Sequence, residues 1–231
     1  MLKLFSVSIL LLLCSCVTVN TGVTDSPQAT SQAVTSPNRA MERSTKGLTY
    51  KLGMDPGNLA DYCSATAVGP AALITAEHCT AHISGDIVLL NGHEARVRDV
   101  ITDNMDHAII IFAESQFDRY AVIAKLPIVG DEVFMWGNSL FDSFLRRGYV
   151  CTFVWNQPFM DIPVGSGWMV MDMQVSGGDS GSGIFNKRGQ LIAVLTGYSR
   201  SASSVYATSM PFNFDKAKIR AHVNSKHLSP R

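Results

Sequence analysis

The chain has 231 residues, of which 46% are hydrophobic and 16% charged, and its formal net charge is zero. This length suits one two-lobed globular unit or two small domains. The balanced charge, with no basic stripe and no acidic tail, argues against a nucleic-acid partner and against a strongly charged protein partner.

The first sixteen residues, 1–16, have the composition of a targeting segment. Lys3 gives a short positive start, and the apolar run that follows is too short to span a bilayer. The run ends in L-C-S-C, which resembles a bacterial lipobox with Cys16 as the lipidated residue. Cys14 is a poorer candidate for lipidation because Leu13 would then stand directly before the modified cysteine. With Cys16 as the lipidated residue, Cys14 stands at the position two residues before it, where Ala, Ser or Thr is usual. An ordinary secretory signal is the alternative, although no good small-x-small cleavage site precedes Asn20.

Residues 17–46 are rich in Thr, Ser, Asn, Gln and Pro and contain no aromatic residue. Such a stretch cannot bury enough apolar surface to offset its ordering entropy. We interpret it as a flexible tether that holds a folded domain, residues 47–225, away from a membrane surface. The front of the chain therefore predicts an exported protein of the cell envelope, anchored to the membrane through Cys16, with secretion as the alternative.

From residue 48 onward, short β-type runs alternate with turn signals such as Asn91-Gly92. The runs in the first half cover 62–68, 71–75, 87–90, 94–100 and 108–112. Those in the second half cover 132–136, 148–155, 168–174, 183–185, 190–197 and 205–208. So many short strands indicate an all-β sandwich or barrel. Amphipathic spacing predicts a final helix over 213–223.

The most distinctive segment is G-G-D-S-G-S-G at residues 177–183, with Ser180 at its centre. Glycine adopts backbone conformations closed to other residues, and it lets a substrate carbonyl approach main-chain N–H groups. Ser180 would then stand exposed as a nucleophile, and the N–H groups of Gly178 and Ser180 would form an oxyanion hole. Alone, the segment could equally be a glycine-rich turn between two strands.

Two upstream segments supply the partners that a nucleophilic serine needs. His78 follows an apolar run that ends in Thr-Ala, and Asp106 precedes an isoleucine-rich run. Each also has a simpler interpretation, as a core histidine and as a turn residue. Asp103 is a rival carboxylate three positions away. We favour Asp106 because it abuts the β run.

The order His, Asp, Ser and the three local motifs resemble those of trypsin-like (chymotrypsin-fold) serine proteases. T-A-E-H-C around His78 resembles the family's T-A-A-H-C, and D-H-A-I-I from Asp106 resembles D-I-A-L-L. G-D-S-G around Ser180 matches in full. The resemblance implies two antiparallel β-barrels, residues 47–125 and 126–210, with the active site between them.

The resemblance also implies a serine endopeptidase that hydrolyses polypeptide substrates through an acyl-enzyme intermediate. Ser180 would attack the scissile carbonyl, His78 would take and return the proton, and Asp106 would orient the imidazole. No cofactor is implied. Family members often bridge the cysteine after the histidine to one about sixteen residues upstream.

This feature of the family predicts a disulfide between Cys63 and Cys79, which would be stable in an exported protein. Two unrelated buried thiols are the alternative. Cys151 is then expected to be a buried free thiol.

A zinc site deserves weighing because His78 and His82 are four residues apart. Metalloproteases of the H-E-x-x-H type need glutamate where Cys79 stands. We therefore expect no metal and interpret the remaining histidines as surface or structural residues: His82, His93, His107, His222 and His227.

The chain departs from the digestive members of this family in its activation. Those members are cleaved before an I-V-G-G-like terminus, whose new amine pairs with the aspartate before the serine. No such sequence occurs upstream of Cys63. Asp179 must therefore find another partner, since a buried unpaired carboxylate is costly. The candidates are Arg146, Arg147, Arg200 and backbone donors.

The substrate pocket departs as well. In the digestive branch its base lies six residues before the serine, which is Gln174 here, so a preference for Lys or Arg is not expected. Thr196 and Gly197 would line its wall, and no histidine occupies their strand. The inference is a neutral P1 residue.

Three other functions remain open from the sequence. One is a catalytically silent member of the fold that binds peptides or a surface partner. Another is a passive structural lipoprotein of the envelope. The third is an esterase, which would use the same three residues.

Overall fold

A computed structural model describes residues 39–53, 62–103, 105–124, 127–138, 143–154, 168–198 and 205–209, which all belong to one compact unit. The predicted signal peptide, the predicted C-terminal helix and residues 17–38 of the predicted tether lie outside these ranges. No helix within the described ranges is long and apolar enough to cross a membrane.

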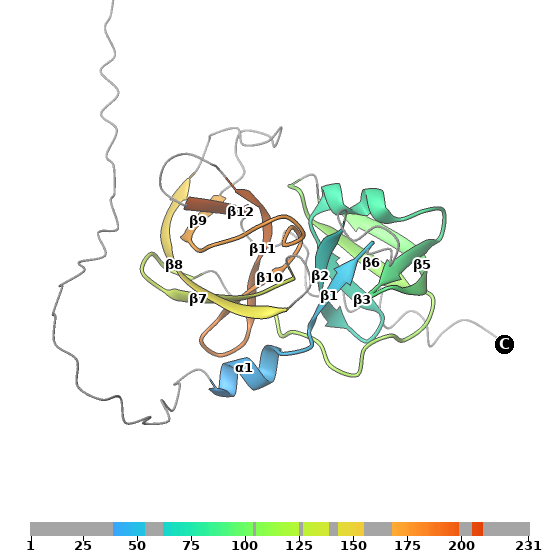
Figure 1. Cartoon of the computed structure of the whole chain (residues 1–231), viewed down its shortest axis with the longest axis horizontal. Helices are drawn as coiled ribbons and strands as arrows, with labels where there is room; N and C mark the ends of the chain where they lie inside the picture. Colours follow the sequence, from blue (N-terminus) through green and yellow to red (C-terminus); the bar gives the residue numbers. More distant parts are fainter. Residues whose placement is uncertain are drawn as a thin grey trace, which may run out of the picture. The chain divides into compact units, whose positions relative to one another are not determined.

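The described residues form two closed, antiparallel, six-stranded barrels (Figure 1). The first has the order β1-β2-β3-β6-β5-β4 and the second the order β10-β11-β12-β9-β8-β7. This architecture confirms the predicted all-β fold with two antiparallel barrels. The strands of the first barrel are β1 (Thr49–Leu52), β2 (Cys63–Gly69), β3 (Ala72–Thr75), β4 (Ile87–Leu90), β5 (His93–Thr102) and β6 (Ala108–Phe112). Those of the second are β7 (Glu132–Gly137), β8 (Phe144–Val154), β9 (Trp168–Asp172), β10 (Gly183–Asn186), β11 (Leu191–Tyr198) and β12 (Val205–Ser209).

Strands buried on both faces explain the continuous apolar runs in the sequence. In β6 every residue is buried, and alternate side chains reach different clusters because successive side chains point to opposite faces. Ile110 and Phe112 join the interior of the first barrel, whereas Ile109 and Ile111 face a second cluster. That second cluster also contains Phe185 of β10, so it packs the two barrels against each other.

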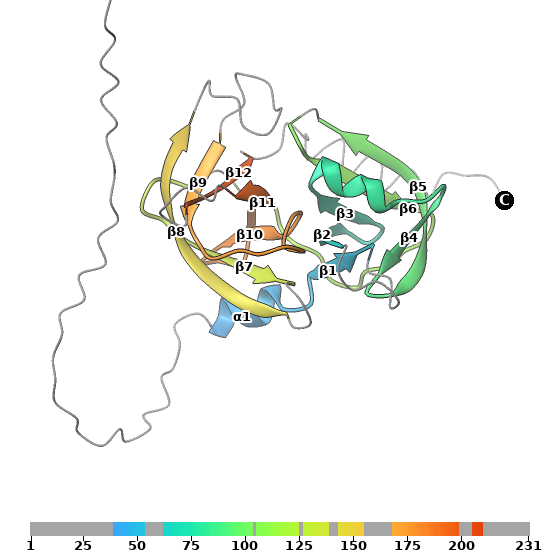
Figure 2. The same cartoon turned by 45° about the horizontal axis from the view of Figure 1, so that its top comes forward.

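Two short helical segments accompany the barrels. A 3-10 helix, η1 (Glu77–His82), follows β3 in the first barrel (Figure 2). The α-helix α1 (Arg39–Thr45) lies beside the second barrel (Figure 1). Met41 of α1 is buried in the cluster between the barrels.

The helix α1 corrects the predicted tether, which was expected to extend to residue 46. Polar composition predicted no ordered structure here, but α1 gains its order from tertiary contacts. The Nε1 of Trp136 donates to Thr45 Oγ1 at 2.8 Å, and Arg119 Nη2 donates to Ser44 O at 2.8 Å. The ordered domain therefore begins at least as early as Arg39.

One strand was not expected, and another begins four residues earlier than expected. The strand β1 (Thr49–Leu52) was not predicted, and β8 begins at Phe144 instead of the predicted residue 148. The missed start of β8 contains Arg146 and Arg147, and charged residues are untypical of a buried strand. Arg146 is nevertheless buried, because an ion pair satisfies its charge.

Candidate active site

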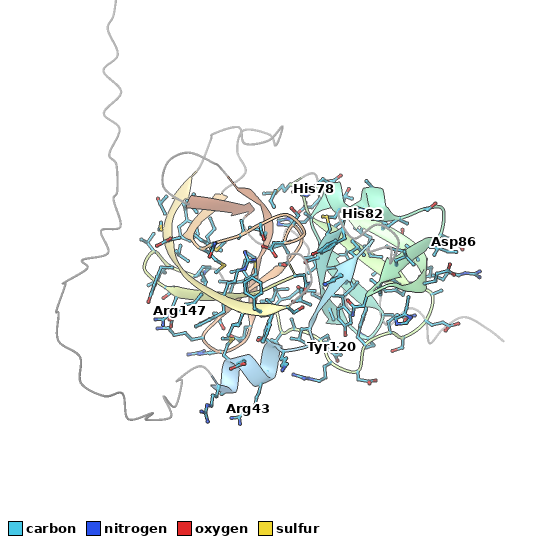
Figure 3. All side chains as sticks on the ribbon, in the orientation of Figure 1. Arg43, His78, His82, Asp86, Tyr120 and Arg147 are labelled. Carbon is cyan, nitrogen blue, oxygen red and sulfur yellow. A yellow bond between two sulfur atoms is a disulfide. The ribbon has the colours of Figure 1, made fainter. Side chains whose placement is uncertain are left out.

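His78 lies at the start of η1, where the chain leaves the buried strand β3. Ala76 keeps an extended backbone, with φ −71° and ψ 145°, and the next residues turn into the 3-10 helix. The His78 side chain is 46% exposed, whereas Cys79 beside it is fully buried. In Figure 3, His78 lies at the edge of the first barrel that faces the second.

Asp106 holds the imidazole of His78 from the loop between β5 and β6. Both carboxylate oxygens of Asp106 lie 3.0 Å from His78 Nδ1, and Oδ1 also accepts from the His78 backbone N–H at 3.0 Å. The backbone carbonyl of Asp106 accepts from Glu77 N at 3.1 Å. Asp106 has φ +60°, in the left-handed region that a residue other than glycine seldom occupies. Asp103 makes a separate pair with His107, so Asp106 is the carboxylate that meets His78.

Ser180 lies on a turn that needs two of its glycines. Gly181 has φ +86°, and a Cβ there would lie 2.0 Å from Ser64 O. Gly178 has φ +90°, and a Cβ there would lie 2.7 Å from the Tyr62 ring. The turn of the second barrel therefore approaches β2 of the first barrel more closely than any side chain would allow.

This close approach brings Ser180 to the residues around His78. The carbonyl of Ser180 accepts from Ser64 N at 2.7 Å and lies 3.7 Å from Cys79 Sγ. Cys79 is bonded to Cys63, as predicted, with an S–S distance of 2.02 Å. The disulfide thus joins η1 to β2 directly beneath the serine turn.

Ser64 and Asn138 support the serine turn, and neither was predicted from the sequence. Ser64 Oγ donates to Gly178 O at 2.7 Å and accepts from Asn138 Nδ2 at 3.0 Å. The backbone N–H of Asn138 donates to Asp179 Oδ1 at 2.9 Å. No motif marks these positions in the sequence, because their role depends on the approach of the two barrels.

Several N–H groups of the turn have acceptors within the chain, including those of Asp179, Gly181 and Ser182, whereas those of Gly178 and Ser180 have none in the described residues. Asp179 N donates to Ser176 O at 3.2 Å. Neither the N–H of Gly178 nor that of Ser180 donates to another group within the described part of the chain. These two groups can donate hydrogen bonds to an external ligand without breaking an internal bond.

Asp179 is fully buried, and its partner is Arg146 of β8. Oδ2 lies 2.8 Å from Arg146 Nη1, and it also accepts from Ser176 N at 2.8 Å. Burial raises the pKa of the Asp179 carboxyl, while the Ser176 N–H, the Arg146 guanidinium and the Asn138 N–H act to lower it. Of the three predicted arginine candidates, Arg146 is therefore the one that meets Asp179, together with backbone donors. Arg147 instead pairs with Glu132, and Arg200 lies outside the described residues.

The predicted pocket residues differ in their surroundings. Gln174 is exposed, and its carbonyl accepts from Arg146 Nη1 at 2.5 Å. Thr196 and Gly197 are buried in β11, and Thr196 Oγ1 has no hydrogen-bond partner among the described residues. No hydrogen bond in those residues joins Gln174 to either of them. Gln174 also ties the segment before Ser180 to the guanidinium that meets Asp179.

One group of possible metal ligands occurs in the described ranges. The ligand atoms of Cys63, His78 and Cys79 lie within 4.8 Å of one another. Both sulfurs belong to the disulfide, so they are not thiolate ligands. Cys151 forms no disulfide within the described residues and is partly exposed, which corrects the expectation of a buried thiol.

Two six-stranded antiparallel barrels, with a histidine–aspartate pair on one and a glycine-flanked serine turn on the other, define the chymotrypsin-like class of β proteins. A family model described as "Trypsin-like peptidase domain" matches residues 63–194. The chain belongs to this family, whose members are hydrolases of the serine-protease type. No curated protein sequence is significantly similar to the chain.

Solved structures of proteases share the fold. An inactive form of Rv3671c from M. tuberculosis H37Rv has a TM-score of 0.61 and 15% identity, over 89% of this chain and 98% of the other. The active form of the Rv3671c protease gives 0.59 and 14%, over 91% and 96%. The HtrA-type protease AlgW with a tripeptide gives 0.61 and 16%, over 81% of this chain and 64% of AlgW. At these identities the likeness establishes the fold alone.

Proposed function

We propose that the chain is an exported, lipid-anchored serine endopeptidase that uses His78, Asp106 and Ser180. The observation that carries the proposal is the bond of His78 Nδ1 to both oxygens of Asp106, 3.0 Å each, beside the anchored turn of Ser180. AlgW is recorded with peptides bound, which supports a polypeptide substrate for a protein of the same fold.

The chemistry follows from which imidazole nitrogen is occupied. Asp106 engages Nδ1 of His78, which leaves Nε2 to accept the proton of Ser180 Oγ. The serine oxygen then bonds to the scissile carbonyl carbon, and His78 returns the proton to the leaving amine. Water repeats the sequence on the acyl-enzyme and releases the acid. Asp106 stabilises the imidazolium that forms in each half-reaction.

The oxyanion of each tetrahedral intermediate would bind to the N–H groups of Gly178 and Ser180. Both donors are free of internal hydrogen bonds in the described residues, which supports this role. Ser64 fixes the neighbouring peptide by donating to Gly178 O, so the donors need little reorganisation on binding. One such donor is worth about 3 kcal/mol of transition-state stabilisation in a comparable enzyme.

The site would need no proteolytic activation. Asp179 already has a cationic partner in Arg146, at 2.8 Å, in the place where digestive relatives use a new amino terminus. This internal pair supports a turn that is assembled as soon as the chain folds. The same guanidinium binds Gln174 O and so holds the segment before the serine.

Specificity would favour an uncharged P1 residue. Gln174 offers no carboxylate to a Lys or Arg side chain, and the charge of Arg146 is neutralised by Asp179. Thr196 and Gly197 would contribute the wall of the pocket. Profiling of a peptide library, with the Ser180→Ala protein as control, tests this preference. Dominant cleavage after Lys or Arg would contradict it.

A fluorophosphonate probe tests the catalytic proposal without knowledge of the substrate. We expect covalent labelling of Ser180 in the unmodified chain and none in Ser180→Ala. Labelling should fall by several orders of magnitude in His78→Gln, because the serine loses its base. An unlabelled chain that still binds peptides would instead identify a silent peptide-binding member of the fold. Labelling without peptidase activity, but with hydrolysis of small esters, would identify an esterase.

The envelope anchor rests on the lipobox-like end of the first sixteen residues. Expression of the full chain in a bacterium, followed by detergent-phase partition and mass measurement, tests it. We expect a lipid-sized mass increase and partition into the detergent phase, both lost in Cys16→Ser. A mature protein that starts elsewhere and stays in the aqueous phase would show secretion instead.

A further inference from the structure

We propose that the buried pair Asp103–His107 is a clamp that positions Asp106 for catalysis. The proposal rests on the proposed function, because it assigns a role to residues that act through Asp106. The loop between β5 and β6 carries two aspartates, and each of them pairs with a different histidine. Asp106 faces outward to His78, and Asp103 faces inward to His107.

The clamp closes the loop that joins β5 to β6. The strands end at the pair Thr102 and Ala108, which leaves residues 103–107 to make the connection. Asp103 Oδ2 lies 2.7 Å from His107 Nδ1, and its Oδ1 accepts from His107 N at 3.2 Å. Oδ1 also accepts from Met105 N at 2.9 Å. One carboxylate thus binds both the backbone and the ring of the residue that follows Asp106.

Asp106 is the residue that this closure constrains. It has φ +60°, a conformation that an aspartate adopts only where its surroundings hold it there. Its neighbours on both sides, Met105 and His107, donate their N–H groups to Asp103. The peptide carrying the outer carboxylate is therefore fixed at both ends.

The pair Asp103–His107 is more deeply buried than the pair Asp106–His78. The side chains of His107 and Asp103 are 0% and 6% exposed, whereas His78 is 46% exposed. Hydrogen bonds shielded from water are stronger, and a buried polar side chain is costly unless it is bonded. An isoleucine, as in the D-I-A-L-L pattern, would fill such a buried position but could not bond to Asp103. The His107 ring therefore adds a hydrogen bond to Asp103 that an apolar side chain of the same size would not make.

The experiment removes that connection and keeps the volume. His107→Ile lacks the ring donor, although Asp103 still receives the two backbone N–H groups, so folding should survive. His107→Leu serves if the β-branched side chain does not fit. His107→Asn is the rescue variant, because its amide nitrogen can stand in for Nδ1. His93→Ile is the matched control, since His93 is an exposed histidine of the same barrel.

The rate of fluorophosphonate labelling of Ser180 is the first readout. We expect a roughly 10- to 100-fold slower rate in His107→Ile, the scale of loss that a misplaced catalytic group produces. His107→Asn should recover most of that loss, and His93→Ile should label at the unmodified rate. An unchanged rate in a folded His107→Ile protein would overturn the clamp and leave the triad intact.

A double-mutant cycle separates positioning from general stability. If the clamp acts through Asp106, adding His107→Ile to Asp106→Asn should slow labelling by less than twofold further. If the fold-decreases in labelling rate of the two single variants multiply in the double variant, His107 has a merely structural role. Denaturant unfolding of each variant establishes that the labelled proteins are folded.

Imidazole NMR gives a readout that does not require activity. With ¹⁵N-histidine, the His78 Nδ1–H bonded to Asp106 should give a hydrogen-bonded signal in the unmodified chain, assigned by its absence in His78→Gln. We expect this signal to weaken or shift in His107→Ile and to return in His107→Asn. Persistence of the signal in His107→Ile overturns the clamp. A chain whose Ser180 never labels, but whose His78 signal responds in this way, overturns the proposed function and retains the clamp.

Discussion

At the scale of single residues, Asp179 shows how a buried charge can organise a site. Its carboxylate receives the Arg146 guanidinium and the backbone N–H groups of Ser176 and Asn138. These donors come from β8, from the end of β7 and from the serine turn itself. A single carboxylate therefore connects the neighbouring strands β7 and β8 to the segment that carries Ser180.

Replacement of Asp179 should damage both stability and activity. Asp179→Ala leaves Arg146 buried without its counter-ion, which typically costs about 3–5 kcal/mol. We expect that loss in the free energy of unfolding, measured by denaturant titration, and a large decrease in the labelling rate of Ser180. Asp172→Ala, which removes an exposed carboxylate of the same barrel, is the control. Full activity in Asp179→Ala would contradict the organising role.

The pKa of Asp179 predicts how stability varies with pH. Burial raises this pKa above its ordinary value, so the folded chain keeps the proton to a higher pH than the unfolded chain does. The resulting stabilisation is present below the ordinary pKa and is lost as pH rises through the folded value. The unfolding free energy of the unmodified chain minus that of Asp179→Ala should therefore decrease with rising pH in that window. Equilibrium unfolding at a series of pH values measures it, and an increasing difference would show that the donors outweigh burial.

We expect Ser64 to contribute to both the stability of the chain and the reactivity of Ser180. Its hydroxyl joins Gly178 O to the amide of Asn138, and its backbone N–H holds Ser180 O. Ser64→Ala removes the hydroxyl and leaves buried groups unsatisfied, at about 1–3 kcal/mol. We expect a roughly tenfold slower labelling of Ser180, because the turn loses a fixed position. Ser84→Ala, at an exposed serine of the same barrel, should change neither quantity.

At the scale of elements, α1 is a helix that depends on its contacts. Seven residues are too few for a stable isolated helix. Arg119 donates to the carbonyls of Arg43 and Ser44, which lie at the C-terminal end of α1 and have no partner further along the helix. The other contact is the bond from Trp136 Nε1 to Thr45 Oγ1.

That bond to Thr45 can be tested by an isosteric change. Thr45→Val keeps the shape but leaves the buried indole N–H of Trp136 without an acceptor, which should cost about 1–3 kcal/mol of unfolding free energy. Thr102→Val, at an exposed threonine of β5, is the matched control and should cost much less. Equal effects of the two changes would show that the indole bond contributes nothing to stability.

The elements that sequence predicted well are those whose pattern is local. Runs such as Ala108–Phe112 are apolar throughout, and their observed bounds agree with expectation. The helix α1 and the start of β8 were missed for a shared reason. Both contain polar or charged residues whose order comes from partners elsewhere in the chain, Trp136 and Asp179. No window of neighbouring residues carries that information.

The site divides in the same way. The His78, Asp106 and Ser180 motifs each occupy a few adjacent residues, so sequence could propose them and choose Asp106 over Asp103. Ser64 and Asn138 carry no motif, since their contacts exist only where the two barrels meet. The choice of Arg146 from three arginines likewise required the pairing of β7 with β8.

At the scale of the whole molecule, the disulfide links the two parts of the site through the first barrel. It closes a loop between positions 16 residues apart, for which chain-entropy arguments give about 3 kcal/mol. We expect the double change Cys63→Ala and Cys79→Ala to lose about 2–4 kcal/mol of unfolding free energy. Cys151→Ser, at the free cysteine, is the control and should change it little. A double variant as stable as the unmodified chain would contradict this expectation.

The position of the disulfide also makes the stability of the site depend on oxidation. Cys79 follows His78 directly, and Cys63 precedes the serine that holds Ser180 O, so one oxidation reaction acts on both halves of the site. Disulfides form in oxidising compartments and are rare in the reducing cytosol. In a reducing compartment the chain would therefore lack the stabilisation that this bond supplies. The site proposed here would reach its full stability only after oxidation, so its assembly would depend on the compartment in which the chain folds.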